Sequence, residues 1–205
     1  MGSALREWRV AHLSDQALLR RIQQGDRQAI EYLIERYQRP LYNFALRFLG
    51  DGDAAADICQ HAFIQLFTHA DELHADESLR PWLFRVARYR CLDELRRNRT
   101  VPFSQMTAPD EADGPSPLEQ VADAAPLPAE LAERGDLQQI LAEAIAALPV
   151  KFREVVTLRY VADLSFAEIG QVLGLPEATA KTHFHRAKPL LRAFLRARGI
   201  TQTIS

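Results

Sequence analysis

Residues 100–135 form a segment that cannot fold by itself, and this segment constrains how the rest of the chain is organised. It holds six of the eleven prolines and most of the local excess of acidic residues. Such a composition buries too little apolar surface to offset the entropy lost when a chain becomes ordered. We therefore predict a flexible, acidic, proline-rich linker at 100–135 between one unit at 1–99 and another at 136–205.

Charge is distributed unevenly along the chain, although the formal net charge is only −2. Residues 1–100 carry a net +1, residues 101–136 a net −7 and residues 137–205 a net +4. The acidic middle hides two flanking parts that could each contact DNA, so the total charge does not exclude a nucleic-acid partner.

Composition narrows the class of protein further. A hydrophobic content of 47% is enough for a packed core. No apolar run is long enough to span a membrane, and the N-terminus lacks the apolar region of a signal peptide. The two cysteines, Cys59 and Cys91, cannot form a disulfide framework and suit a reducing compartment. We expect a cytoplasmic protein without membrane insertion.

The N-terminal unit has the pattern of consecutive helices, and strand alternation is not visible in it or elsewhere. Residues typical of helix starts precede the apolar-periodic runs. We expect Pro40 to break or kink the second helix, because proline lacks the backbone N–H that an interior helical position uses. The expected caps and helix starts are Ser14, Asp26, Asp53 and Ser78.

The C-terminal unit is predicted to contain four helices, starting near Leu127 and again at Pro149. Ser165 and Glu168 have the spacing of a capping box at the start of the third helix, and Gly174 is placed to end it. A tight turn containing glycine then joins two short helices, which is the signature of a helix-turn-helix. The predicted fold class is all-α, with two small helical domains joined by the linker.

The second helix of this motif has a composition suited to a DNA groove. An ordinary helical hairpin with a solvated basic face is the alternative interpretation. Pro189 lies inside this helix and is expected to kink or end it. The candidate DNA-binding residues are Thr179, Lys181, Thr182, His183, His185, Arg186 and Lys188.

Residues 80–99 carry seven arginines against two acidic residues. On a helix, Phe84, Ala87, Cys91 and Leu95 would line a core stripe, while aromatic and cationic side chains interleave on the other side. That combination suits stacking on unpaired bases and neutralising phosphates, although the aromatic residues could instead lie in the core. The candidate DNA-binding residues here are Trp82, Arg85, Arg88, Tyr89, Arg96, Arg97 and Arg99.

Residues 53–67 place Asp57, Gln60 and Ile64 on one face of a predicted helix. Polar residues beside an apolar anchor suit docking to a partner protein's helix. The simpler interpretation is an amphipathic helix whose Phe63 and Phe67 lie in the core, and both interpretations are compatible.

Catalytic and metal-binding motifs are not found. The sequence has no glycine-rich phosphate loop, no HExxH motif and no nucleophile elbow. Cys59 with His61, and His183 with His185, are pairs at a spacing that faces apart on a helix. We therefore predict neither an enzyme nor a protein with a metal ion or another cofactor.

Several motifs in order resemble the extracytoplasmic-function sigma factors, the group 4 initiation subunits of bacterial RNA polymerase. They include "GDRQAIEYLIERY", "DICQHAF", "RPWLFRVARYRCLDELRR", "LPVKFREVVTLRYVADLSFAEIGQVLGL" and "KTHFHRA". The resemblance covers residues 14–99 and 137–198. It implies a sigma factor that binds the β and β′ subunits of core polymerase and directs promoter-specific initiation, in a stress or envelope response. It also implies an anti-sigma factor as a further candidate partner.

The resemblance assigns a role to each segment. Asp57 and Gln60 match the helix that docks on the polymerase clamp, within a region 2-like domain at 1–99. The arginine-rich helix matches the part that melts the minus-ten element, and the linker matches the segment that threads the RNA channel. The helix-turn-helix matches the reader of the minus-thirty-five element, within a region 4-like domain at 136–205.

The sequence departs from the family pattern at three positions in the helix-turn-helix. Ala178 stands where glycine is usual, His183 replaces a common arginine, and Pro189 lies inside the expected recognition helix. Two other interpretations remain open from the residues alone. One is a stand-alone helix-turn-helix regulator, and the other is a protein-binding adaptor.

Overall fold

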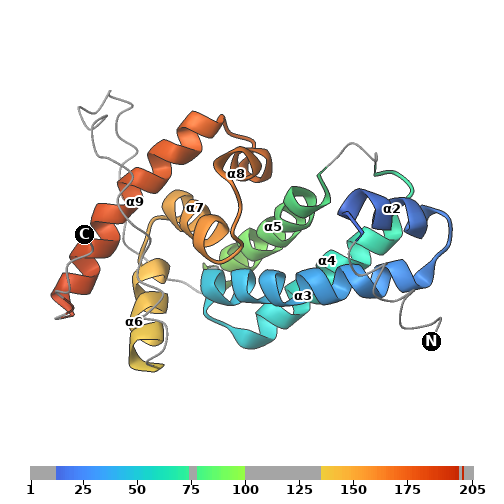
Figure 1. Cartoon of the computed structure of the whole chain (residues 1–205). Coiled ribbons are helices and arrows are strands. Elements are labelled where there is room, and N and C mark those ends of the chain that lie inside the picture. Colours follow the sequence, from blue (N-terminus) through green and yellow to red (C-terminus); the bar gives the residue numbers. More distant parts are fainter. Residues whose placement is uncertain (1–12, 74–77, 100–134, 199, 201–205) are drawn as a thin grey trace, which may run out of the picture.

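The computed structural model describes residues 13–73, 78–99, 135–198 and 200, and its regular elements over these ranges are all α-helices (Figure 1). The all-α prediction is confirmed. Most of the predicted linker, residues 100–134, lies outside the described part. The first unit contains α2 (Asp15–Gln23), α3 (Arg27–Leu49), α4 (Gly52–His69) and α5 (Leu79–Arg99). The second contains α6 (Gly135–Ala146), α7 (Val150–Tyr160), α8 (Phe166–Leu173) and α9 (Glu177–Ala197).

Side-chain caps begin the first three helices. Ser14 and Asp26 cap α2 and α3 as predicted, and their side chains accept hydrogen bonds from the first-turn N–H groups of Ala17 and Gln28. The prediction that Asp53 caps α4 is wrong. Asp51 is the cap, because its Oδ1 accepts from the backbone N–H groups at positions 53 and 54, at 2.9 and 3.1 Å. The Asp53 carboxylate lies in the first turn, where its negative charge interacts favourably with the helix dipole.

Two helices continue past an interior proline, so the expected break at Pro40 and the expected helix end at Pro189 are wrong, whereas a kink at either position stays a prediction. Helix α3 passes through Pro40, and α9 passes through Pro189 and continues to Ala197. The loss of one backbone hydrogen bond is offset by packing on both sides of each proline. Leu41 is buried next to the first proline, and Leu191 is buried just beyond the second.

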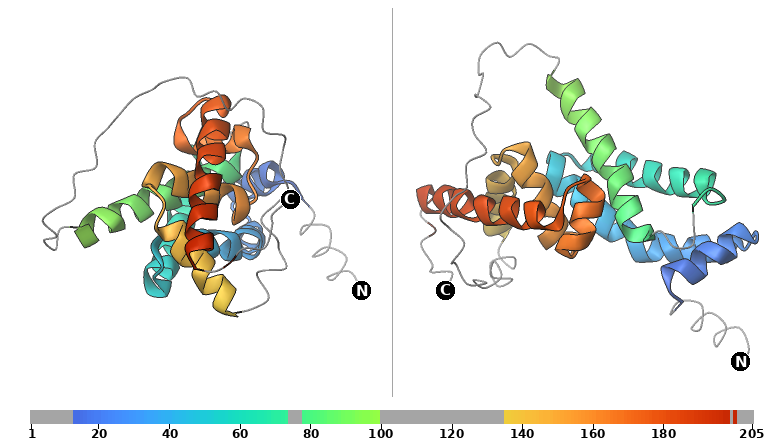
Figure 2. Two further views of the ribbon diagram at one scale, coloured as in Figure 1. Left: turned by 90° about the vertical axis from the view of Figure 1, so that its left-hand side faces the viewer. Right: turned by 90° about the horizontal axis from the view of Figure 1, so that it is seen from above.

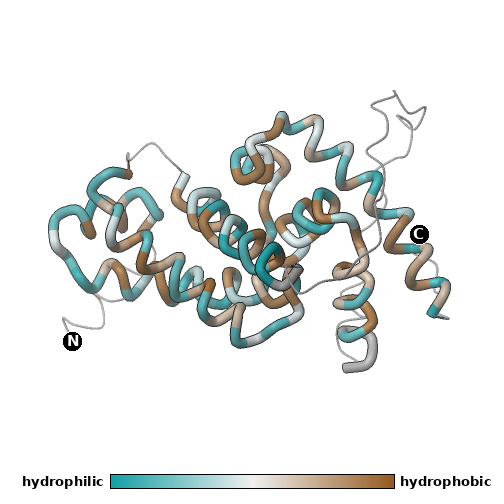
Figure 3. Tube along the Cα trace, turned by 180° about the vertical axis from the view of Figure 1, so that it is seen from behind, coloured by the Kyte–Doolittle hydropathy of each residue, from teal (hydrophilic) through white to brown (hydrophobic). Residues whose placement is uncertain are grey.

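Aromatic rings form the centre of the first unit. The centroid of the Phe44 ring lies 5.7 Å from that of the tilted Phe48 ring and 5.6 Å from that of the Phe84 ring, which it meets edge-on. All three side chains are fully buried. The predicted core stripe of α5 is confirmed, since Ala87 and Cys91 are also fully buried and Leu95 packs partly against the core. Figure 3 shows polar and apolar residues alternating along the helical traces, as amphipathic helices require.

The helix-turn-helix forms as predicted. The Ser165 backbone N–H donates to the Glu168 carboxylate at 2.8 Å, and the Glu168 N–H donates to the Ser165 hydroxyl at 3.2 Å. Gly174 ends α8 in the left-handed conformation, with φ at 69°. Helix α9 then buries a regular stripe of side chains against α6, α7 and α8. The stripe consists of Ala180, Phe184, Ala187, Leu191 and Leu195.

The two units lie against each other. Helix α5 contacts α8, and α3 contacts both α6 and α7 (Figure 2). The buried apolar side chains of the described residues form one contiguous cluster across both units. Helix α6 begins at Gly135, and the earlier start near Leu127 that we predicted falls outside the described residues.

Candidate nucleic-acid interface

Helix α9 presents an exposed polar face opposite its buried stripe. Lys181, Thr182, His185 and Arg186 are all exposed. The ammonium of Lys181 pairs with the Glu177 carboxylate at 2.8 Å, and the Thr182 hydroxyl donates to the carbonyl of the preceding turn at 2.9 Å. This face begins in the first turns of the helix, the part of a recognition helix that approaches base edges.

Three of the residues predicted for this face are partly buried and lie at its margins. The His183 ring is partly buried and packs edge-on against Phe152, with centroids 5.8 Å apart. The ammonium of Lys188 lies 5.0 Å from the centroid of the Phe184 ring, a cation–π distance. Thr179 is also partly buried. The structure therefore brings four of the seven predicted residues together on the open face.

The predicted DNA-binding residues of α5 divide into two groups. Tyr89, Arg96 and Arg97 are exposed, and the two arginines pair with acidic residues one turn earlier on the same helix. Trp82 is partly buried against the core. The side chain of Arg99 lies outside the described residues. Tyr89 is the exposed aromatic platform of this helix, and Arg88 lies over its ring at 5.4 Å.

Arg85 and Arg88, both partly buried, contact the C-terminal unit. The Arg85 guanidinium donates to the backbone carbonyl of Gln171 at 2.8 Å. The Nε of Arg88 donates to the carboxylate of Glu154 at 2.7 Å, and both side chains are largely buried. Glu154 was not among the predicted site residues, although a carboxylate within the apolar run of α7 is a signal for a buried ion pair.

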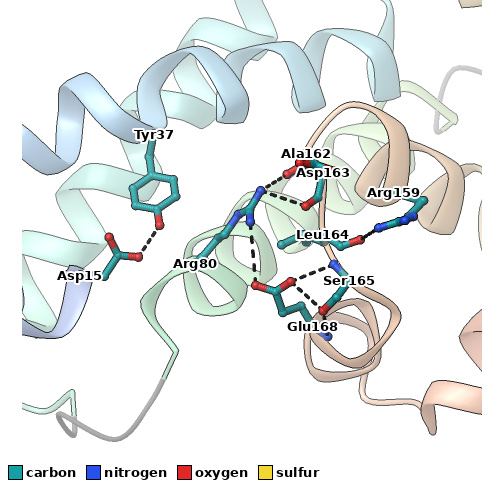
Figure 4. A network of polar contacts seen from close by, with 9 residues as sticks. All are labelled: Asp15, Tyr37, Arg80, Arg159, Ala162, Asp163, Leu164, Ser165 and Glu168. Atoms are coloured by element: carbon teal, nitrogen blue, oxygen red, sulfur yellow. Dashed lines mark hydrogen bonds and ion pairs between the residues drawn. The ribbon is translucent and has the colours of Figure 1, made fainter. Parts of the chain in front are cut away.

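Arg80, also missed among the site residues, makes the same kind of contact. Its guanidinium donates to the carbonyls of Ala162 and Asp163, at 2.5 and 3.1 Å, and lies 4.0 Å from the carboxylate of Glu168 (Figure 4). Asp163 has φ at 51°, a left-handed conformation that aspartate tolerates better than most residues. The turn at Asp163 positions the carbonyls of residues 162 and 163 so that both accept hydrogen bonds from Arg80.

Helix α4 carries an exposed face of mixed character, which we call the α4 face: Asp57, Gln60, Ile64 and Phe67. These residues recur at helical spacing opposite the buried stripe of the helix. The prediction that Phe67 lies in the core is wrong, since 64% of its surface is exposed. The reason is that α3 and α5 cover one side of α4 only, while its apolar residues occupy a wider arc. Phe63 is partly buried against the core.

Titratable groups in this region are shifted mainly by burial. Burial raises the pKa of the Cys91 thiol to about 12 and also raises that of Cys59. Burial, together with nearby Arg90, lowers the pKa of His61. Within the described ranges, no three or more His, Cys, Asp or Glu side chains gather where a metal ion could bind. None of the described helices combines the length and the apolar character needed to cross a membrane.

Comparison with known proteins decides the family. The Sigma-70 region 2 model matches residues 33–101, and the Sigma-70 region 4 model matches residues 138–191. The ECF RNA polymerase sigma-E factor of Escherichia coli is 30% identical over 179 residues, which span 86% of this chain and 91% of that protein. The chain belongs to the extracytoplasmic-function RNA polymerase sigma factors. It therefore binds core RNA polymerase and promoter DNA and directs transcription initiation, and it is not an enzyme.

Other similar proteins are also sigma factors or share this fold. The RNA polymerase sigma-H factor of Pseudomonas aeruginosa is 30% identical over 189 residues, covering 87% of this chain and 96% of that protein. The fold is similar to that of CnrH, solved in complex with the cytosolic domain of CnrY, with a TM-score of 0.67 and 23% identity over 89% of this chain and 97% of that one. The sigma factor RpoE of Bartonella quintana, solved with the anti-sigma factor NepR, has a TM-score of 0.59 at 19% identity, over 81% of this chain and 96% of that one.

Proposed function

We propose that three faces of this sigma factor each carry out a separate step of transcription initiation. The α4 face docks on core polymerase, at its β and β′ subunits, within a domain at 1–99. Helix α5 of the same domain captures the melted minus-ten strand. Helix α9 reads the minus-thirty-five element from a domain at 136–205, and residues 100–135 link the two domains.

The exposed face of α9 is the observation that carries this proposal. A buried stripe on one side of the helix leaves Lys181 and Arg186 on the other side, next to exposed hydroxyl and imidazole groups. Arginine and lysine are the commonest partners of guanine in the major groove, and short polar side chains contact phosphates or bases. His183 and Lys188 lie at the margin of the face, so we assign them to phosphate contacts or packing.

The test compares Arg186→Ala and Lys181→Ala in holoenzyme transcription from a panel of minus-thirty-five variants. A residue that reads a base should relax preference at one position, with a loss of discrimination of about 1–3 kcal/mol when the contact is bidentate. A phosphate contact should weaken all variants alike. Arg196→Ala is the matched control, because it removes an exposed arginine from the last turn of the same helix. Equal behaviour of all three variants on every template would contradict the assignment.

The assignment of α5 rests on its accessible aromatic and cationic side chains. Stacking of a base on Tyr89 and phosphate contacts from Arg96 and Arg97 need an unpaired strand, which exists only after melting. Arg85, Arg88 and Trp82 belong to the same assignment, as does Arg99 by its place in the sequence. A stand-alone regulator would bind its promoter through α9 without polymerase, and a protein-binding adaptor would not direct promoter use at all. Promoter use that depends on core polymerase therefore distinguishes a sigma factor from both alternatives.

We further propose that this sigma factor acts in the cytoplasm, that an anti-sigma factor holds it inactive, and that it serves a stress or envelope response. The support is the likeness of its fold to CnrH and RpoE, each solved with a partner protein. Affinity purification of the tagged protein before and after envelope stress tests this. Recovery of core polymerase at the same level in both conditions, with no further partner, would contradict it.

A further inference from the structure

The first turn of α9 carries a carboxylate on the face that we assign to the minus-thirty-five element. Glu177 is the first residue of the helix, and its side chain retains 49% exposure. It lies one turn before Lys181, and the two side chains pair at 2.8 Å, so they share one side of the helix. Glu177 was not among the residues predicted to bind DNA. An acidic group at this position repels the DNA phosphates, so it weakens binding to any sequence that offers it no hydrogen-bond donor.

The major groove offers a carboxylate few partners. Guanine presents only acceptors there, and thymine presents an acceptor and a methyl group, whereas cytosine and adenine each present an amino group. Glutamate and aspartate characteristically accept a hydrogen bond from the amino group of cytosine. Recognition helices approach base edges with their N-terminal residues. A carboxylate at that end therefore penalises guanine and thymine and favours cytosine at the position it reaches.

The ion pair with Lys181 leaves Glu177 free to contact a base. An ammonium has three N–H donors and a carboxylate has about four acceptor positions, so each group keeps hydrogen-bonding capacity beyond the pair. Lys181 can donate to Glu177 and to a guanine at the same time. One helical turn rises about 5.4 Å and one base pair about 3.4 Å, so the two side chains reach positions about one or two base pairs apart.

We propose that Glu177 is a specificity-determining residue of α9. Its carboxylate accepts a hydrogen bond from the amino group of a cytosine that lies about one or two base pairs from the base contacted by Lys181. The inference rests on the proposed function, in which α9 reads the minus-thirty-five element. A first-turn carboxylate that only stabilises the helix, through the dipole and the pair with Lys181, would affect all promoters alike. Base reading instead changes the preference at one position.

The test measures initiation by holoenzyme assembled with full-length wild-type, Glu177→Ala or Glu177→Gln sigma factor. The templates are all single-base-pair variants of the minus-thirty-five element. Wild type should prefer cytosine at one position, and Glu177→Ala should lose about 5- to 10-fold of that preference, the low end for one base contact. Glu177→Gln should shift the preference at the same position from cytosine toward adenine, because glutamine pairs with N6 and N7 of adenine.

Two further variants separate direct reading from other effects. In the Lys181→Ala background, adding Glu177→Ala should lower the cytosine preference by the same factor, because the carboxylate contacts the base itself. Glu143→Gln is the matched control. Glu143 is an exposed acid of α6 that pairs at 2.6 Å with Arg198, at the opposite end of α9 from Glu177 (Figure 1). Its removal should keep the wild-type preference at every position.

A uniform loss on all templates, with unchanged preferences, would show that Glu177 only stabilises the helix and would overturn the inference. An effect of Glu177→Ala that disappears in the Lys181→Ala background would also overturn it, because Glu177 would then only position Lys181. If Arg186→Ala relaxes the preference at one position while both Glu177 variants change none, this inference fails and the proposed function stands. If the Lys181, Arg186 and Glu177 variants all leave every preference unchanged, the proposed function fails as well.

Discussion

The α4 face permits a quantitative prediction about docking on core polymerase. Phe67 is 64% exposed and Ile64 is 51% exposed in the free protein. Full burial of a large apolar side chain contributes about 1.5–3 kcal/mol. If docking covers what is exposed, Phe67 contributes about 1–2 kcal/mol of binding free energy and Ile64 about 0.8–1.5 kcal/mol. Removing both should therefore weaken binding by roughly 2–3.5 kcal/mol.

The assay is a titration of labelled sigma factor with purified core polymerase. Phe67→Ala alone should raise the Kd by about 5- to 30-fold, and the double variant by about 30- to 300-fold, at 1.4 kcal/mol per tenfold. The free energy of unfolding should stay within about 0.5 kcal/mol of wild type, because exposed side chains contribute little to the fold. Asp57→Ala with Gln60→Ala should also weaken binding, through the polar half of the same face.

Tyr89→Ala is the matched control for docking. Tyr89 is an aromatic residue of the same unit with 55% exposure, but it lies on α5 and is assigned to DNA. Its removal should leave the Kd for core polymerase unchanged. If the α4 variants keep wild-type affinity while their helical circular dichroism is intact, α4 is not the docking surface. If all variants lose affinity alike, the effect is not specific to α4.

Two further predictions concern stability. Gly170→Ala should lower the melting temperature by several degrees, because a Cβ there would lie 2.7 Å from the carbonyl oxygen of Leu175 and the helix-turn-helix would have to shift, at a cost of about 1–3 kcal/mol. Gly52→Ala, whose Cβ would meet only the Tyr42 hydroxyl at 3.4 Å, should leave the calorimetric transition almost unchanged, and an equal loss in both would contradict this. Burial raises the pKa of the Cys91 thiol in the folded protein to about 12, whereas the pKa in the unfolded chain is about 8.5. The stability that the buried neutral thiol contributes is therefore complete below about pH 8.5 and is lost as the pH rises toward the folded pKa. Between pH 8.5 and 10 the free energy of unfolding should fall by up to about 1.4 kcal/mol per pH unit from this group, and urea titrations should show a shallower decline in Cys91→Ala.

Local features of this protein could be predicted from its sequence with good accuracy. The capping box at Ser165, the glycine stop at Gly174 and the core stripe of α5 all depend on residues a few positions apart. Hydrogen bonds within one turn and the period of the helix determine such features, and neither needs a distant partner. The family motifs were recognisable for the same reason, since they are contiguous.

Packing decided what local patterns could not. The continuation of α3 through Pro40 depends on a core that holds both halves of the helix. The exposure of Phe67 depends on how much of α4 its neighbours cover. A helical period gives the direction of a side chain but not the extent of the surface that buries it.

The contacts between the units depended most on the tertiary structure. Arg88 and Glu154 are separated by 66 positions, and Arg80 and Asp163 by 83. The sequence by itself determined that α5 would be rich in arginine, and DNA phosphates were the partners that the composition indicated. The structure instead pairs three of those arginines with the C-terminal unit. The physical reason is that a guanidinium binds any correctly placed oxygen, and only the packing of the chain determines which oxygens lie within 3 Å.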